Sequence, residues 1–123
     1  MERQLYIKHL LHVYAASADA YIQDDPVPAG KVLVAHRVAA WFTNCSTSEF
    51  VLWYILKDRK YLWLGDDKPG TTGGPCQRDL QTTIGEGMSF GAYSPQITTD
   101  EVFEFVITGC LIDLDLWRRG LSD

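Results

Sequence analysis

The chain has 123 residues, which suits one domain, because two separate cores would each be too small to fold unaided. Apolar residues make up 46% and charged residues 22%, a balance typical of globular proteins that argues against long disordered stretches. The net charge of −5, with no basic run, argues against nucleic acid as a partner. Charges interrupt every apolar stretch, so we expect neither a membrane span nor a secretory signal at the N-terminus.

The first segment, residues 4–23, predicts two strands joined near Ser17. Its side chains alternate without a consistent helical stripe, although a helix over part of this segment stays open as an alternative. Residues 31–45 then predict one long strand, rich in β-branched and aromatic residues. Both faces of this strand are largely apolar, so we expect it in the centre of a sandwich or beneath a partner chain. His36 falls on the face with Val34 and Val38, where a core or interface role is expected rather than a catalytic one.

Residues 49–64 predict a hairpin, because two aromatic-rich runs flank a charged turn. The Gly- and Pro-rich residues 65–77 predict an exposed loop, and residues 79–84 and 88–93 predict short strands around a glycine turn. Residues 101–117 predict the last strand, with a bulge at Gly109 where the apolar alternation changes face. The whole pattern predicts a single all-β domain over residues 1–123, an antiparallel β-sandwich of jelly-roll type with six to eight strands.

No cluster of residues matches a recognisable catalytic motif, so we predict no catalytic residue, no cofactor and no metal site. No serine or cysteine stands in a nucleophile motif, and the Gly-rich loop lacks the Lys of a phosphate cradle. Cys45, Cys76 and Cys110 have no metal or redox spacing and are predicted to be reduced thiols. Asp66 and Asp67 are the best candidates for binding an ion such as calcium, but they supply only part of the oxygen ligands it needs.

Aromatic residues are the strongest functional signal, since four tryptophans and six tyrosines exceed what one small core usually absorbs. The excess is expected on a surface, as a protein interface or a platform for sugars. We predict Trp41, Trp53, Tyr54 and Trp63 as anchors of an interface. The alternative that these rings are half buried in the core stays open.

From residue 25 to residue 112 the layout resembles small β-sandwich virion proteins of tailed bacteriophages, the accessory proteins that decorate capsids or attach to heads and tails. The matching features, in order, are VPAGK, VAAWFTNCS, YLWLG, a Gly-rich connector, GEGMSF and VFEFVITGCLID. The resemblance implies a non-enzymatic structural protein that forms a homo-oligomer, with a trimer as one candidate state. It also implies binding to a major capsid or tail protein, and location in the virion after synthesis in the host cytoplasm.

Residues 1–11 and 116–123 depart from this pattern, and we predict that they are docking arms. Two other functions stay open. One is a carbohydrate-binding or receptor-binding module, in which exposed Trp and Tyr rings stack on a glycan. The other is a small cupin-like enzyme, which needs convergent His and carboxylate groups.

Overall fold

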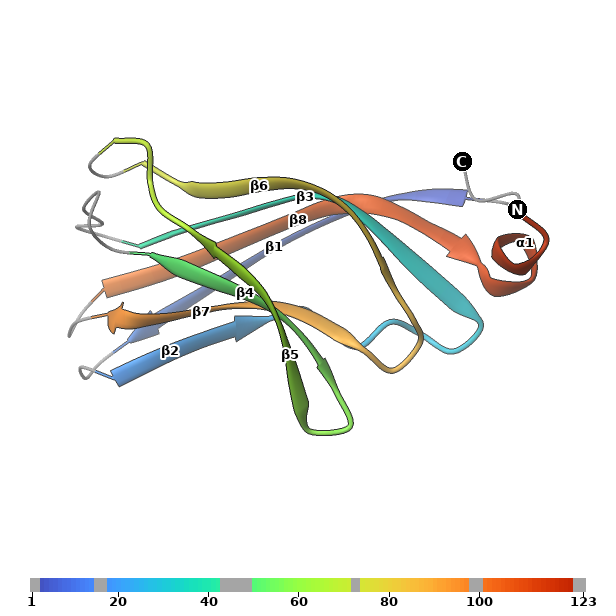
Figure 1. Ribbon diagram of the computed structural model, residues 1–123, viewed down its shortest axis with the longest axis horizontal. Coiled ribbons are helices and arrows are strands. Elements are labelled where there is room, and N and C mark those ends of the chain that lie inside the picture. Colours follow the sequence, from blue (N-terminus) through green and yellow to red (C-terminus); the bar gives the residue numbers. More distant parts are fainter. Residues whose placement is uncertain (1–2, 15–17, 43–49, 72–73, 98–100, 121–123) are drawn as a thin grey trace.

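A computed structural model describes residues 3–14, 18–42, 50–71, 74–97 and 101–120 (Figure 1). Its strands are β1 (Arg3–Tyr14), β2 (Ala18–Gln23), β3 (Lys31–Phe42), β4 (Val51–Lys57), β5 (Lys60–Asp67), β6 (Cys76–Ile84), β7 (Ser89–Ile97) and β8 (Glu101–Asp113). One short helix, α1 (Leu114–Arg118), follows β8. No helix among these residues is long and apolar enough to cross a membrane.

The strands form two four-stranded antiparallel sheets that pack face to face, in the orders β1-β8-β3-β6 and β2-β7-β4-β5 (Figure 1). Every connection crosses from one sheet to the other, except the β4–β5 hairpin. This order is that of an eight-stranded jelly roll. The predicted all-β sandwich is therefore confirmed, and the two N-terminal strands, the hairpin and the glycine turn are found close to their predicted places.

The core is built from rings on the inner faces of both sheets. Trp53 on β4 packs against Phe90 on β7 and Phe105 on β8, with ring centroids 6.4 Å away in each case. All three side chains are at most 1% exposed. The Trp53 indole N–H donates to Asp67 at 2.7 Å, so this buried polar atom has a partner. Packing of large rings across the sandwich thus holds the two sheets together.

The predicted bulge at Gly109 is wrong, because the extra residue lies in the facing strand. β8 pairs with β1 in unbroken register, whereas the β3–β8 register shifts between Ala35 and Arg37, which leaves His36 as the additional residue. Side chains that face the core are Leu33, Ala35, Val38, Ala40 and Phe42, and those on the outer face are Val34, His36, Arg37, Ala39 and Trp41. His36 is therefore exposed on the outer face rather than part of an apolar core face.

Gly109 has a different role, which is to let β3 approach. A Cβ added at this position would lie 2.1 Å from the carbonyl oxygen of Val34 and 3.0 Å from the Cα of Ala35. Only glycine leaves room for backbone atoms at this distance. The bulge in β3 and the glycine in β8 are thus one structural unit.

The predicted last strand, residues 101–117, is also too long, because β8 ends at Asp113 and α1 begins at Leu114. The Leu114 N–H donates to the carbonyl of Gly30 at 2.9 Å, where the chain leaves the sheet. At the end of the helix the Arg119 N–H donates to the backbone carbonyl of Asp115. The described part of the first predicted arm, from Arg3, is paired with β8 along its length. Of the second predicted arm, residues 116–118 lie in α1 and residues 121–123 are outside the description.

A polar contact joins β1 to the chain just beyond β2. Tyr6 on β1 donates its hydroxyl proton to Asp24, just beyond β2, at 2.7 Å. Asp24 is 3% exposed and accepts a second hydrogen bond from the Asp25 N–H at 2.8 Å. Burial, and next the Asp24 carboxylate, raise the pKa of the Tyr6 hydroxyl above its ordinary value of 10.0.

We predict that Gly109→Ala destabilises the protein by about 2 to 4 kcal/mol, because the new methyl group collides with backbone rather than with a mobile side chain. Urea unfolding followed by Trp fluorescence measures this loss. Gly70→Ala is the control, since a Cβ there meets nothing within 4 Å and φ is not positive. Equal stability of the two variants would contradict the close approach at Gly109.

A second prediction concerns alkaline pH. Because the pKa of Tyr6 is higher in the folded state than its ordinary value of 10.0, this contact stabilises the protein fully below pH 10 and loses its effect as pH rises further. Tyr6→Phe is therefore expected to lower stability by about 1 kcal/mol at pH 7 and to make the alkaline decline shallower. Thermal unfolding at pH 7 to 11 tests this, with Tyr61→Phe as the control; an unchanged pH profile in Tyr6→Phe would refute it.

Candidate functional site

The outer face of β1 carries three strongly exposed aliphatic side chains, including the two most exposed among the described residues. Leu5 is 74% exposed, Ile7 is 62% exposed and Leu11 is 58% exposed. Alternation along the strand puts all three on the same face. β1 is also an edge strand, paired with β8 alone in its sheet. An apolar stripe therefore runs along an open sheet edge, a combination that favours contact with another chain.

A polar cluster interrupts this face beside the stripe. Glu104 on β8 accepts a hydrogen bond from the Trp41 indole N–H at 2.6 Å, and its other oxygen lies 2.9 Å from Nε2 of His9. The His9 and Trp41 rings are nearly parallel, with centroids 6.3 Å apart. Two nitrogen groups thus satisfy the one carboxylate at the centre of this face and fix the Trp41 ring across β8 and β3.

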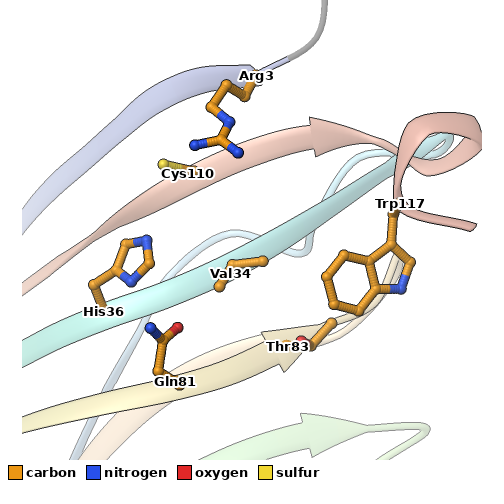
Figure 2. A pocket seen from close by; sticks show the side chains of 7 residues that line it. All are labelled: Arg3, Val34, His36, Gln81, Thr83, Cys110 and Trp117. Carbon is orange, nitrogen blue, oxygen red and sulfur yellow. The ribbon is translucent and has the colours of Figure 1, made fainter. Parts of the chain in front are cut away.

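Two hollows lie on the same outer face. One, of about 470 Å³, is mostly apolar and lies where Trp41, Ala39 and Val106 meet. The other, of about 340 Å³, lies near α1 and is lined by side chains from five elements (Figure 2). Figure 2 shows Arg3, His36 and Trp117 arranged around Val34. This second hollow is more polar than the first and contains both an Arg and a His.

The outer face of the other sheet carries a cluster of aromatic rings. We call it the aromatic cluster; its members are Tyr21 on β2, Tyr54 on β4, Tyr61 and Trp63 on β5, and Tyr93 on β7. Tyr61 and Trp63 are nearly parallel, at 11°, with centroids 5.4 Å apart. Tyr21, Tyr61 and Trp63 are 43 to 45% exposed, so the cluster presents ring surface to solvent.

The Tyr54 ring packs beneath the more exposed rings of this cluster. It is 0% exposed, and its hydroxyl donates to Gln23 at 2.9 Å. The ring lies over Gly91 of the neighbouring strand, where a Cβ would come within 2.5 Å of Tyr54 Cζ. A glycine at this position lets the ring lie against the sheet, and the more exposed rings pack on top of it.

Polar groups border the aromatic cluster. Asp19 accepts a hydrogen bond from Tyr93, and burial together with this carboxylate raises the pKa of the Tyr93 hydroxyl. Burial, with Tyr61 and Asp19 as further causes, raises the pKa of Tyr21 as well. These hydroxyls therefore stay protonated at neutral pH and can act as hydrogen-bond donors and acceptors.

The structure places the four predicted anchors in different environments. Trp53 lies in the core and Tyr54 lies beneath the aromatic cluster, so neither presents surface. Trp41 is half-buried and Trp63 is 45% exposed, on opposite outer faces of the sandwich. Trp41 and Trp63 therefore stay as candidate contact residues. The β1 stripe was not predicted from the sequence, although the alternation of residues 5–11 was a signal for it.

The predicted ion candidates do not act as a pair. Asp67 is engaged by Arg78, at 2.7 Å, and by the Trp53 indole. Arg78 also donates to the carbonyls of Leu64 and Asp66, which ties β6 to β5 across the sandwich edge. Among the described residues, no group of three or more His, Cys, Asp or Glu side chains is placed to hold a metal ion.

The predicted reduced thiols are found at the two described cysteines. Cys76 is buried and Cys110 is half-buried, and neither forms a disulfide. Cys45 lies outside the described residues.

Comparison with known proteins gives no family. No protein-family model matches the chain, and no curated protein matches it. Solved structures match the chain only at low similarity. The NLP core of Drosophila is 18% identical, over 85% of this chain and 98% of that chain, with a TM-score of 0.46. The Yersinia pseudotuberculosis-derived mitogen is 9% identical, over 85% of each chain, with a TM-score of 0.44.

Latent PorU from Porphyromonas gingivalis is 10% identical, with a TM-score of 0.45 over 93% of this chain and 13% of PorU. These likenesses are too distant to bear on function, which has to be argued from the surfaces of this chain.

Proposed function

We propose that the protein is a non-enzymatic structural subunit that assembles with copies of itself through the outer face of β1. The observation that carries the proposal is the stripe of Leu5, Ile7 and Leu11, exposed by 58 to 74% along an open sheet edge. Such an edge offers unpaired backbone groups together with apolar side chains, and a second chain can satisfy the former and bury the latter.

Apolar residues next to β1 on the same face also support assembly. Beyond β1 the face continues over Val106 and Ala39 to the hollow beside Trp41. A standard interface buries about 800 Å² of each partner, with a few central aromatic side chains carrying much of the energy. Trp41 is held by Glu104 at the middle of this face, so we assign it as the aromatic anchor of the interface.

The resemblance of residues 25–112 to phage accessory proteins suggests where such a subunit would assemble. We propose that the protein is a virion component, made in the host cytoplasm, that decorates a capsid or attaches to a head or tail. A major capsid or tail protein is then the second partner, and the stoichiometry of the homo-oligomer follows from the mass of the particle.

A second candidate function is carbohydrate or receptor binding, which the aromatic cluster favours. The nearly parallel Tyr61 and Trp63 rings lie on β5, and the polar groups of Asp19 and Gln23 lie next to the cluster. Ring faces attract the C–H groups of a sugar because their π-electrons are partly negative, and carboxylates and amides bind its hydroxyl groups.

Assembly through β1 is tested by Ile7→Lys. We expect the wild-type chain to be an oligomer in sedimentation equilibrium at about 100 µM, and Ile7→Lys to shift the mass toward that of a monomer, since burial of a charge opposes association. The matched control is Leu62→Lys on β5, where the leucine is 60% exposed, nearly the same as Ile7 at 62%. A monomeric wild-type chain, or equal effects of the two substitutions, would overturn the proposal.

The carbohydrate candidate is tested by titrating soluble oligosaccharides of glucose, galactose, mannose and N-acetylglucosamine in calorimetry. If the aromatic cluster binds a sugar, Trp63→Ala weakens the affinity at least about tenfold, as for the loss of a central aromatic contact. Leu62→Ala, which alters the neighbouring residue on the same strand, leaves the affinity unchanged. Saturable binding that survives Trp63→Ala would remove the aromatic cluster from this function.

A further inference from the structure

The polar hollow near α1 has features of a ligand site. Its volume of about 340 Å³ is within the range of small-molecule sites, at the lower end. Five elements supply its walls, so residues far apart in the sequence converge on one place (Figure 2). Arg3 comes from β1, His36 from the bulge of β3, Gln81 and Thr83 from β6, and Trp117 from α1.

The fold brings these residues together for identifiable reasons. Val34 pairs with Cys110 of β8 on one side and with Thr83 of β6 on the other, so it lies in the middle of the hollow. Alternation along β3 puts His36 on the same outer face as Val34, two residues away, and the register shift after it leaves Arg37 on that face as well. The chain leaves β8 after Asp113, and α1 then places the Trp117 indole along one side (Figure 2).

The described side chains of the hollow carry only positive charge. Arg3 is positive, and no carboxylate is among the described side chains that line the hollow. The acidic groups elsewhere on this face have their own cationic or N–H partners: Asp79 pairs with Arg37 at 2.8 Å, Asp113 with Lys31, and Glu104 with Trp41. Within the described part of the chain, no hydrogen bond or ion pair engages the side chains of Arg3, His36 or Gln81. In a protein with a net charge of −5, this is a local concentration of free donors.

We propose that this hollow binds a small organic anion that carries a planar ring. The Arg3 guanidinium presents paired N–H groups that match the two oxygens of a carboxylate or phosphate, and His36 and Gln81 supply further donors. The Trp117 indole provides a flat apolar wall against which a ring can stack. A carboxylate or a phosphate both satisfy this chemistry, and the experiment separates them.

The test is isothermal titration calorimetry of the full chain with four probes: AMP, benzoate, adenosine and inorganic phosphate. AMP and benzoate combine an anionic group with a ring, whereas adenosine has only the ring and phosphate only the charge. We expect AMP or benzoate to bind at least about tenfold more tightly than both single-feature probes, a difference of about 1.4 kcal/mol. Stronger binding of AMP identifies a phosphate site, and stronger binding of benzoate identifies a carboxylate site.

Two variants place the binding in the hollow. Arg3→Met keeps the aliphatic length and removes the charge, and we expect it to weaken the better probe at least about tenfold. Arg37→Met is the matched control, because Arg37 is an exposed arginine on the same sheet face that is paired with Asp79. It is expected to leave the affinity within about twofold.

Trp117→Leu tests whether the indole stacks on the ring of the bound anion. It is expected to weaken AMP or benzoate but not inorganic phosphate, and because α1 has no buried residue the fold tolerates the change. The proposal is overturned if neither AMP nor benzoate binds in a saturable way, if both bind no better than phosphate, or if Arg3→Met and Arg37→Met behave alike. These outcomes are separate from the sedimentation result, since assembly through Ile7 does not require an anion.

Discussion

The single extra residue in β3 is the constraint on which the rest of the β1-β8-β3-β6 sheet depends. A strand that alternates strictly cannot keep both Ala35 and Val38 in the core, because they are three positions apart. The bulge at His36 removes the conflict, and Gly109 in β8 gives the displaced backbone its room. The core is therefore continuous along the whole of β3, and two successive polar residues, His36 and Arg37, lie on its outer face as a consequence.

The two outer faces of the sandwich differ in the side chains that they expose. On the β1 sheet, aliphatic side chains cover one edge, while His36 and Arg37 separate a polar hollow near α1 from an apolar hollow beside Trp41. On the other sheet, rings gather on Tyr54 because Gly91 leaves space for it. Aliphatic surface at an open edge favours burial by another chain, whereas half-exposed rings bordered by polar groups favour a ligand with both apolar and hydroxyl parts.

The sequence was sufficient for most of the strands, since alternation and turn residues are local signals, and the β4–β5 hairpin and the glycine turn at residues 85–87 show this, whereas the end of β8 was missed. It was not sufficient for the anchors. Trp53 and Tyr54 are adjacent and equally aromatic, and only the sheet register decides that the first enters the core and the second lies on the outer face. The polar hollow was also beyond local patterns, because Arg3, His36 and Trp117 meet only after the strands have paired.

The proposed interface and the proposed anion site both include residues of β1. Arg3 of the anion site lies two residues from Leu5 in the apolar stripe, on the same edge strand. An anion held by Arg3 would neutralise the positive charge at that end of β1, where a second copy would bring an Arg3 of its own if the strands paired in parallel. Thermodynamic linkage then requires that any effect of the anion on assembly be matched by an equal effect of assembly on anion affinity. An antiparallel pair of β1 strands separates the two Arg3 side chains by the length of the strand, and in that arrangement the site and the interface act independently.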